Sequence, residues 1–333
     1  MNENNNTLYY CTLFDRNYLS RGIAMYESLA AVCNSFQLYV FAFDDACLQV
    51  LKKMQLPNMT VISLQEFEDP ELLRIKPGRN RAEYCWTCSS STILYCIKTF
   101  QLSHCTYIDA DLYFYNNPQV LMDEMGDKSV MITEHRYTPM YDKSNLSGKY
   151  CVQYVTFRNT QDGLTALQWW RDACIDWCYD RHEDGKFGDQ KYLDDWTTRF
   201  KGVHVLQHLG GGLALWNIQQ YQVFEVNGKL KCKEIATGKE FDPIFYHFHY
   251  LKYFADGTIE LGRRIITPDV KQLFYKPYVK ALEAAKQTIS KIDNSFDPHG
   301  ARPRPTGLKA TLVTIWRKMR NVYHIYSLQD LRM

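Results

Sequence analysis

Residues 105–115 read Cys-Thr-Tyr-Ile-Asp-Ala-Asp-Leu-Tyr-Phe-Tyr. The apolar, β-prone run Cys105–Ile108 is typical of a buried strand. Asp109 and Asp111 follow it two residues apart, so on an extended backbone both carboxylates point to the same side. At a buried strand end they repel each other unless a cation neutralises them. Two hydrated aspartates at a solvent turn are the alternative, but the apolar and aromatic flanks favour an oxygen-liganded site for Mg²⁺ or Mn²⁺.

The segment Tyr107–Asp111 resembles the Asp-x-Asp motif of the GT-A glycosyltransferases, which follows a hydrophobic strand and holds the metal of a nucleotide-sugar. The likeness is greatest to bacterial nucleotide-diphospho-sugar transferases and more distant to the retaining family that includes glycogenin. It covers roughly residues 7–260. The resemblance implies an α/β, Rossmann-like GT-A fold with a mixed, mainly parallel sheet. It also places Ala110 beside the donor and Asp109 and Asp111 on the metal.

The composition agrees with one large α/β domain and an appendage. The chain has 333 residues, and 46% of them are hydrophobic, which is enough for a sizeable core. Its 39 Lys and Arg nearly balance 37 Asp and Glu, so we expect no nucleic-acid partner. The cysteines include one lone C-x-x-C, Cys85 and Cys88, without the second pair of a zinc site. Reduced thiols, no signal peptide and no long apolar run indicate a cytoplasmic protein.

Alternating strand and helix patterns predict a mainly parallel βαβ sheet. Strands are expected at residues 8–14, 37–43, 59–64, 129–133, 152–157, 204–206, 222–226 and 244–249, and helices after the first strand and at 92–100 and 164–178. Ligands of such sheets bind beyond the carboxyl ends of the strands. Residues 15–18 and 109–111 both lie at that edge, so we expect them to share one site.

The segment Asp15-Arg16-Asn17-Tyr18 resembles the Asp-x-Asn-Tyr that lies against the nucleotide base in the glycogenin-type family. A carboxylate at Asp15 can accept the N3 proton of uracil, and Tyr18 can stack on the ring. Asn17 and Thr12 are assigned to the same donor site. Capping of a helix by Asp15 or Asn17 is the alternative, and the two interpretations are compatible.

A second donor-site segment precedes the helix at 92–100. Residues 83–87 resemble a Glu-Tyr-x-Trp-Thr stretch of the bacterial sequences, which implies donor contacts for Trp86 and Thr87. In the glycogenin-type family an arginine on this helix contacts the phosphates. Ser89–Thr92 stand there in this chain, so no residue is assigned to that contact. The basic loop Arg74–Arg81 is either a phosphate-binding segment or a solvated loop.

The segment Gly188-Asp189-Gln190 resembles the Asp-Gln motif that lies near the anomeric carbon in retaining enzymes. We therefore assign Asp189 and Gln190 as catalytic, with a helix-capping Asp189 as the alternative. His135 follows the strand predicted at 129–133 and is either an acceptor contact or a surface-turn histidine. The polar loop 137–149 is long enough to form a lid.

Further resemblances complete the expected site. Trp216-Asn217 resembles an Ala-x-Trp-Asn stretch of the bacterial sequences and is assigned to the acceptor. His247-Phe248 matches the start of the His-Phe-x-Gly that supplies a third metal ligand, although Tyr250 stands in place of Gly. His249 therefore remains a rival ligand to His247. Lys252 is assigned to the diphosphate.

The C-terminal part is expected to form an appendage. An amphipathic helix is predicted at 270–292, which closes the GT-A domain of residues 7–292, and a linker at 293–307. A basic amphipathic helix is expected over 308–333, with one stripe formed by Leu308, Leu312, Ile315, Trp316, Met319, Tyr323 and Tyr326. Such a helix suits an anionic membrane surface on the cytoplasmic side. Docking on the main domain is the alternative.

The sequence thus predicts metal-dependent transfer of a sugar, from a UDP-sugar by preference, to a glycan or lipid-linked acceptor in surface polysaccharide synthesis. Retention of configuration is expected from the Asp-Gln resemblance. One alternative is a sugar-nucleotide nucleotidyltransferase, but residues 13–16 are not the Gly-rich basic loop of that class. The other is a non-catalytic glycan-binding protein with the same fold.

Overall fold

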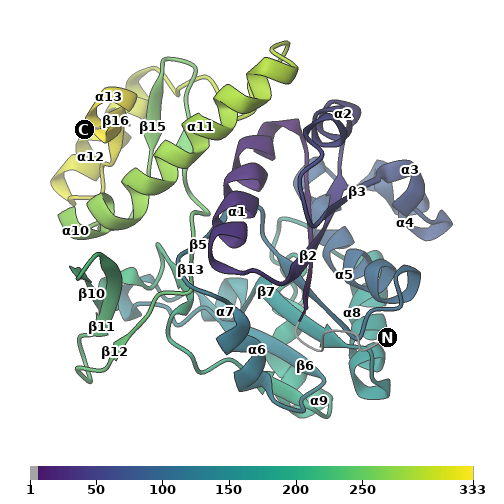
Figure 1. Cartoon of the computed structure of the whole chain (residues 1–333). Helices are drawn as coiled ribbons and strands as arrows, with labels where there is room; N and C mark the ends of the chain where they lie inside the picture. The colour runs from purple at the N-terminus through teal and green to yellow at the C-terminus, as the bar shows by residue number, and fades with distance from the viewer. Residues whose placement is uncertain (1–6, 333) are drawn as a thin grey trace.

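The computed structural model describes residues 7–332 and centres on a seven-stranded sheet, in the order β3-β2-β1-β4-β7-β6-β8 (Figure 1). The strands are β1 (Leu8–Phe14), β2 (Phe36–Ala42), β3 (Met59–Ser63), β4 (His104–Ile108), β6 (Val130–Glu134), β7 (Tyr150–Arg158) and β8 (Val203–Val205). Neighbours among β3, β2, β1 and β4 pair in parallel. β7 is antiparallel to β4 and β6, and β8 is parallel to β6. The mixed, mainly parallel sheet expected from the sequence is confirmed.

Helices cover both faces of this sheet, so its strands are buried on both sides. Alternate residues of β1 enter different cores: Tyr10 packs with residues of α1 (Leu19–Val32) and α11 (Lys276–Ile292), and Cys11 with residues of α5 (Arg81–Thr99) and α8 (Gln161–Asp176). Figure 1 shows α1 and α11 side by side on one face. The inner strands β1, β4 and β7 are buried along almost their whole length, whereas the edge strands β3 and β8 are only partly buried.

A small second sheet continues the chain beyond the acidic pair. It consists of β5 (Leu112–Phe114), β13 (Phe245–His247) and β9 (Gly211–Ala214), in the order β5-β13-β9. β13 is antiparallel to β5, and its register sets His247 opposite Leu112. A residue that is distant in sequence therefore lies next to Asp111.

Shorter elements connect these layers. The helices are α2 (Asp45–Met54), α3 (Leu64–Phe67), α4 (Pro70–Ile75), α6 (Gln119–Met125), α7 (Ser144–Ser147) and α9 (Trp196–Arg199). The 3-10 helices are η1 (Arg16–Tyr18), η2 (Lys76–Gly78), η3 (Pro139–Tyr141), η4 (Lys191–Asp195) and η5 (Ile218–Gln220). A third sheet contains β10 (Tyr221–Val226), β11 (Lys229–Glu234) and β12 (Glu240–Phe241).

The C-terminal part differs from the expectation of one long helix. The helix predicted at 270–292 is confirmed as α10 (Pro268–Val270), the π-helix η6 (Lys271–Tyr275) and α11. The helix predicted over 308–333 is wrong beyond Met319: α12 (Leu308–Met319) ends there, and Asn321 turns the chain with φ 55°. β16 (Ile325–Ser327) then pairs with β15 (Thr258–Glu260), which also pairs with β14 (Lys252–Tyr253), and α13 (Leu328–Arg332) follows.

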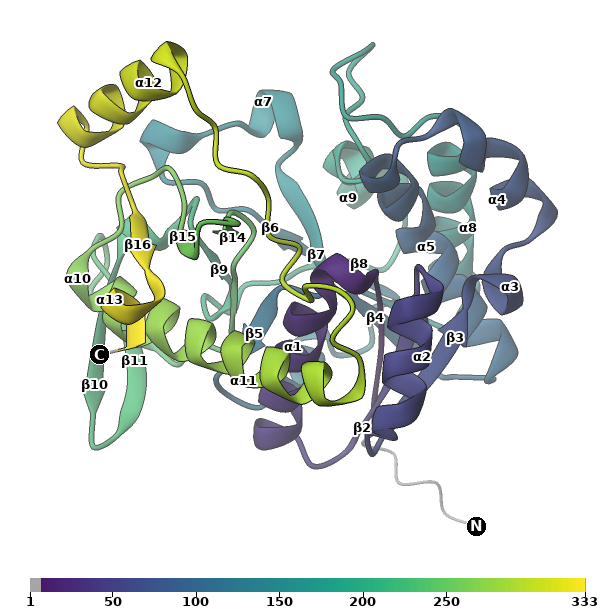
Figure 2. The same ribbon diagram turned by 90° about the horizontal axis from the view of Figure 1, so that it is seen from above.

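Two residues of the stripe expected for the helix at 308–333 therefore lie outside α12. Tyr326 lies in β16 opposite Ile259, and Tyr323 lies in the turn before that strand. Pairing with β15 outcompetes helix propensity in this segment. Figure 2 shows α12 at the periphery of the molecule, away from the central sheet. No helix in the part of the chain that the structure describes is long and apolar enough to cross a membrane.

Candidate active site

Asp109, Asp111 and His247 converge where β4 ends beside β13. Their ligand atoms all lie within 4.8 Å of one another. Nε2 of His247 lies 3.0 Å from Oδ1 of Asp111 and 3.5 Å from Oδ2 of Asp109. Two carboxylates and one imidazole form a donor set that suits Mn²⁺ or Mg²⁺. The structure thus brings the predicted metal ligands together.

The charges in this cluster are strongly coupled. Burial raises the pKa of Asp109 to about 6, against the opposing effect of His247. Burial alone would raise the pKa of Asp111, but His247 lowers it to about 2. Burial alone would lower the pKa of His247, but Asp111 and Asp109 raise it well above its ordinary value. The two carboxylates therefore attract positive charge, so the cluster fits a divalent cation.

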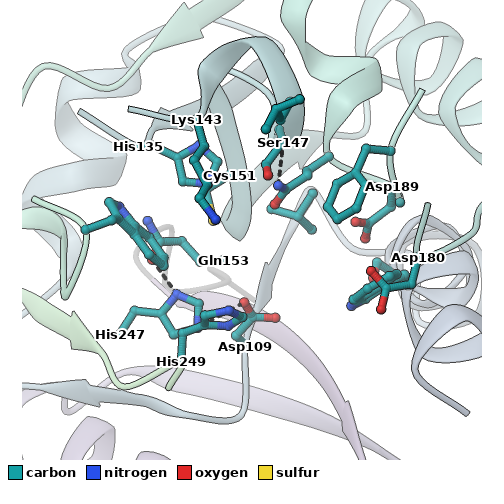
Figure 3. Close-up of a pocket in the computed structure, with 18 of the residues that line it drawn as sticks. Asp109, His135, Lys143, Ser147, Cys151, Gln153, Asp180, Asp189, His247 and His249 are labelled. Carbon is teal, nitrogen blue, oxygen red and sulfur yellow. Dashed lines mark hydrogen bonds and ion pairs between the residues drawn. The ribbon is translucent and has the colours of Figure 1, made fainter. Parts of the chain in front are cut away.

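Gln153 of β7 orients the histidine. Nδ1 of His247 lies 2.8 Å from Oε1 of Gln153, as the dashed line in Figure 3 marks. The Gln153 side chain is fully buried, and its Nε2 has no hydrogen-bond partner among residues 7–332. With Nδ1 donating to Gln153, Nε2 faces the carboxylates and is available to a metal. Gln153 is thus a supporting residue for His247.

A cavity of about 630 Å³ opens beside this cluster. Figure 3 shows Asp109, His247 and His249 on one side of it, and Asp189 across from them. His135 and Ser147, the last residue of α7, also line the cavity. His249 lines the cavity but is not among the residues whose ligand atoms meet within 4.8 Å of one another. The geometry favours His247 over His249 as the third ligand.

Asp189 and Gln190 lie at the start of η4 and line the cavity. Gly188 has φ 52°, and a Cβ there would lie 3.4 Å from the Trp86 ring, so the turn is tightly packed. The Trp170 indole N–H donates to the Asp189 carbonyl at 3.0 Å. Burial raises the pKa of Asp189 to about 7 although a hydrogen bond from Ser89 opposes the shift. The segment is therefore fixed with a protonatable carboxyl group toward the cavity.

Gln190 also joins this segment to the lid loop. Its Nε2 donates to the Ser147 carbonyl at 2.5 Å, the second dashed line in Figure 3. Nζ of Lys191 donates to the Ser144 carbonyl at 2.9 Å, and the Lys149 N–H donates to Asp194 at 2.7 Å. The predicted lid is thus held against η4 by three hydrogen bonds.

The expected acceptor residues divide into two groups. His135 and Trp216 line the cavity, and the His135 ring stacks on Tyr137 with centres 4.6 Å apart. Burial lowers the pKa of His135 to about 3, so its ring is neutral near pH 7. Asn217 is buried and does not line the cavity; its amide donates to the carbonyls of His135 and Gly212 at 2.9 and 2.8 Å. Asn217 supports His135 rather than facing the cavity.

The expected base-binding residues lie outside this cavity. Asp15 caps η1, as its Oδ1 accepts the Asn17 backbone N–H at 2.7 Å, so the capping interpretation is confirmed. Tyr18 is partly exposed, and the Arg21 guanidinium lies 4.5 Å from its ring centre. Thr12 is fully buried in β1, and its hydroxyl has no partner within the described part of the chain.

Three other predicted donor residues do not line the cavity either. Thr87 is buried, and its hydroxyl donates to the Glu83 carbonyl at 2.8 Å within α5. Ala110 is 7% exposed between the two aspartates, and Lys252 lies exposed on β14. Trp86 does line the cavity, where its ring lies 6.3 Å from that of Phe187.

Several lining residues were not predicted from the sequence. Ser89, Phe187 and Arg264 face the same cavity as Asp189. Ser89 lies in a buried run of hydroxyl residues in the middle of α5, and such a run in an apolar helix requires partners for its hydroxyl groups. Arg264 carries no local signal, because its place depends on the sheet β14-β15-β16 of the C-terminal part, whose strand β15 it follows.

Comparisons with known proteins agree with this fold. No protein-family model matches the chain. It is 30% identical over 299 residues to "uncharacterized protein YfnD" of Bacillus subtilis (strain 168), an alignment that covers 87% of this chain and 92% of YfnD. It is 28% identical over 296 residues to "uncharacterized protein YfnF" of the same organism, which covers 86% and 96% of the two chains.

Among solved structures, the galactosyltransferase LgtC in complex with donor and acceptor sugar analogs superposes with a TM-score of 0.51. The two chains share 12% sequence identity, and the match covers 83% of this chain and 96% of LgtC. Such a likeness concerns the arrangement of helices and strands. The chain therefore belongs to the same protein family as YfnD and has the GT-A glycosyltransferase fold.

Proposed function

We propose that the protein is a glycosyltransferase that moves a sugar from a nucleotide-diphosphate donor to a glycan or lipid-linked acceptor and requires Mn²⁺ or Mg²⁺. One observation carries the proposal: Asp109, Asp111 and His247 meet within 4.8 Å at the carboxyl end of β4. Asp109 and His247 line the same cavity as Asp189 and Gln190. This combination supports a donor diphosphate at the cluster and a reacting sugar in the cavity.

The proposed metal site uses the chain's own residues in distinct ways. Asp109 and Asp111 supply the anionic oxygen ligands, and His247 supplies a neutral nitrogen that Gln153 keeps in one orientation. When bound, the ion would neutralise the negative charge that grows on the departing diphosphate. Lys252 and Trp86 complete the proposed donor contacts, one toward the diphosphate and the other as a wall of the cavity.

We further propose that the reaction retains the anomeric configuration. An inverting enzyme needs a base that deprotonates the acceptor on the face opposite the leaving group. Gln190 cannot serve as that base, and its amide instead suits shielding of positive charge at the anomeric carbon. In the proposed step the bond from that carbon to the diphosphate breaks and a bond to the acceptor oxygen forms. The acceptor proton passes to the departing phosphate, with Asp189 beside the reacting carbon.

The acceptor is proposed to enter along His135 and Trp216. The Trp216 ring offers an apolar face against which a sugar ring can pack. His135 stays neutral because it is buried, so it suits a hydrogen bond to an acceptor hydroxyl rather than an ion pair. Both features favour an uncharged sugar unit as the acceptor.

The exposed face of helix α12 supports the proposal that the protein binds a membrane surface near its acceptor. Its outward stripe is apolar and unusually exposed: Leu308 is 87%, Leu312 67% and Met319 75% exposed, and Ile315 and Trp316 are about half exposed. Lys309, Lys318 and Arg320 stand beside that stripe. We propose that this face rests on an anionic bilayer surface at the cytoplasmic side, near lipid-linked or surface-polysaccharide acceptors.

A donor screen tests the proposed activity. Purified protein is incubated with UDP-, CDP-, GDP- and ADP-hexoses, and release of nucleoside diphosphate is measured with Mn²⁺, with Mg²⁺ and with EDTA. We expect release from at least one donor that EDTA abolishes and that the Asp111→Asn variant lacks. Release of equal rate in EDTA and in Mn²⁺ would contradict metal dependence, and no release or binding of any donor would contradict the proposed activity.

A further inference from the structure

Asp15 is the residue that the resemblance assigns to the N3 proton of uracil, but its carboxylate is already occupied. Oδ1 accepts the Asn17 backbone N–H at 2.7 Å. Oδ2 pairs with Nε of Arg81, the first residue of α5, and lies 3.5 Å from the Asn17 side-chain amide. The Asp15 side chain is 10% exposed. Both of its oxygens therefore face protein donors rather than a ligand.

Arg81 joins Asp15 to a second carboxylate. Its Nη2 lies 3.2 Å from Oδ2 of Asp44, the N-cap of α2, which also accepts from Nε of Arg16 at 2.9 Å. The four side chains carry two negative and two positive charges. Displacing Arg81 would leave two neighbouring carboxylates with one cation, so the arrangement resists opening toward a ligand.

The other edge of the Arg81 guanidinium is free. The Arg81 side chain is 54% exposed, and its Nη1 has no hydrogen-bond partner among residues 7–332. Nη1 and the second hydrogen of Nη2 form a fork of two parallel donors. Because Asp15 and Asp44 hold the opposite edge, this fork is fixed in direction.

The position of this fork suits a nucleobase. β1 pairs in parallel with β4, with Cys11 opposite Tyr107, so Asp15 and Asp111 leave the sheet at the same edge on neighbouring strands. Asp44 follows β2, on the other side of β1. The two carboxylates that hold Arg81 thus leave the sheet one and two strands, about 5 to 10 Å, from the strand end that carries the metal cluster. A nucleoside extends over such a distance from its diphosphate.

We propose that Arg81 binds the donor base, and that this base presents two adjacent acceptor atoms, as cytosine does with N3 and O2 or guanine with O6 and N7. The proposal rests on the proposed function and differs from the uracil that the sequence suggests. Uracil places an N–H donor between its two carbonyl oxygens, so it cannot offer the fork two adjacent acceptors. Both oxygens of Asp15 already accept from Asn17 and Arg81, so its carboxylate is not free to turn toward that N–H.

Isothermal titration of CDP, GDP and UDP, each with Mn²⁺, tests this. We expect CDP or GDP to bind wild-type protein about 10- to 100-fold more tightly than UDP. Arg81→Ala and Arg81→Lys should reduce that preference to a few-fold, because neither keeps the fork. Arg74→Ala, at an exposed arginine of the same basic segment, is the control and should keep it. The CDP and GDP arms distinguish a pyrimidine from a purine site.

UDP binding as tight as that of CDP and GDP, or a preference that Arg81→Ala leaves unchanged, would overturn the assignment of Arg81. The wild-type comparison decides even where a variant fails to fold. If none of the three diphosphates binds in the presence of Mn²⁺, the proposed function itself is wrong, and the base assignment falls with it.

Discussion

Nδ1 of His247 lies 2.8 Å from Oε1 of Gln153, while Nε2 of the same ring lies 3.0 Å from Oδ1 of Asp111. The histidine is thus held between a neutral amide from β7 and a carboxylate beyond β4. The central sheet supplies both partners, and β13 of the small sheet supplies the histidine. The orientation of the ring therefore depends on the packing of two sheets and not on any local motif.

The first prediction concerns this support. Gln153→Met keeps the size of the side chain but removes the oxygen that fixes the His247 ring, so Mn²⁺ affinity should fall about 10- to 100-fold. Gln153→Glu keeps an acceptor oxygen and should retain more of the affinity. The affinity is measured by isothermal titration with Mn²⁺ and the nucleoside diphosphate that binds the wild type best. Gln161→Met, at an exposed position of α8, is the control; a Gln153→Met protein with wild-type affinity would refute the role.

The second prediction concerns Gln190. Replacement by Ala removes the amide near the proposed reaction centre and should slow transfer about 10- to 100-fold with donor affinity nearly unchanged. It also removes the hydrogen bond to Ser147, so amide hydrogen exchange in residues 144–149 should accelerate. Proton NMR of the product should show retention. An α-linked donor sugar that emerges β-linked would contradict retention and require a base, with Asp189 and His135 as the candidates.

The third prediction concerns α12. Leu312→Glu places a charge in the exposed apolar stripe and should strongly reduce sedimentation with phosphatidylglycerol vesicles at low salt, while nucleotide binding stays unchanged. Leu73→Glu, at a half-exposed leucine of α4, is the matched control and should sediment as the wild type does. If the wild type does not sediment with these vesicles, α12 is not a membrane-binding element.

The fourth prediction concerns the attachment of α12. The buried Arg317 pairs with the buried Glu260 at 2.6 Å and donates to the Gly262 carbonyl at 3.1 Å. Arg317→Met removes a positive charge from beside the buried Glu260 carboxylate, so the free energy of unfolding should fall by about 3–5 kcal/mol. Urea denaturation measures the change, and adding Glu260→Gln should recover part of it. A single variant as stable as the wild type would show that the pair does not hold the helix.

The sequence was sufficient to select those residues of the candidate site that lie in local motifs. Asp109, Asp111 and Asp189 follow elements whose patterns identify them, and the structure places them around one cavity or its edge. The choice between His247 and His249 required the register of β13 against β5, which joins segments more than 100 residues apart. The role of Gln153 depended on the same packing and had no local signal.

Two kinds of expectation failed for physical reasons. Thr87 and Asn217 resemble ligand-binding residues, yet their side chains form hydrogen bonds to backbone groups, because a buried polar group needs a partner. Tyr323 and Tyr326 fit a helical stripe by spacing, but the chain turns at Asn321 and Tyr326 joins a sheet. Helical spacing of residues in a sequence does not reveal strand pairing between distant segments.

The measurement that tests the central claim most directly is titration of the Asp111→Asn variant with Mn²⁺ and the nucleoside diphosphate that the wild type binds best. The substitution keeps the shape of the side chain and removes one ligand charge from the cluster. We predict that metal-dependent nucleotide binding is abolished while the protein stays folded with a lower melting temperature, because the substitution also removes the ion pair between Asp111 and His247. Binding by Asp111→Asn with wild-type affinity would contradict the metal site and the function proposed from it.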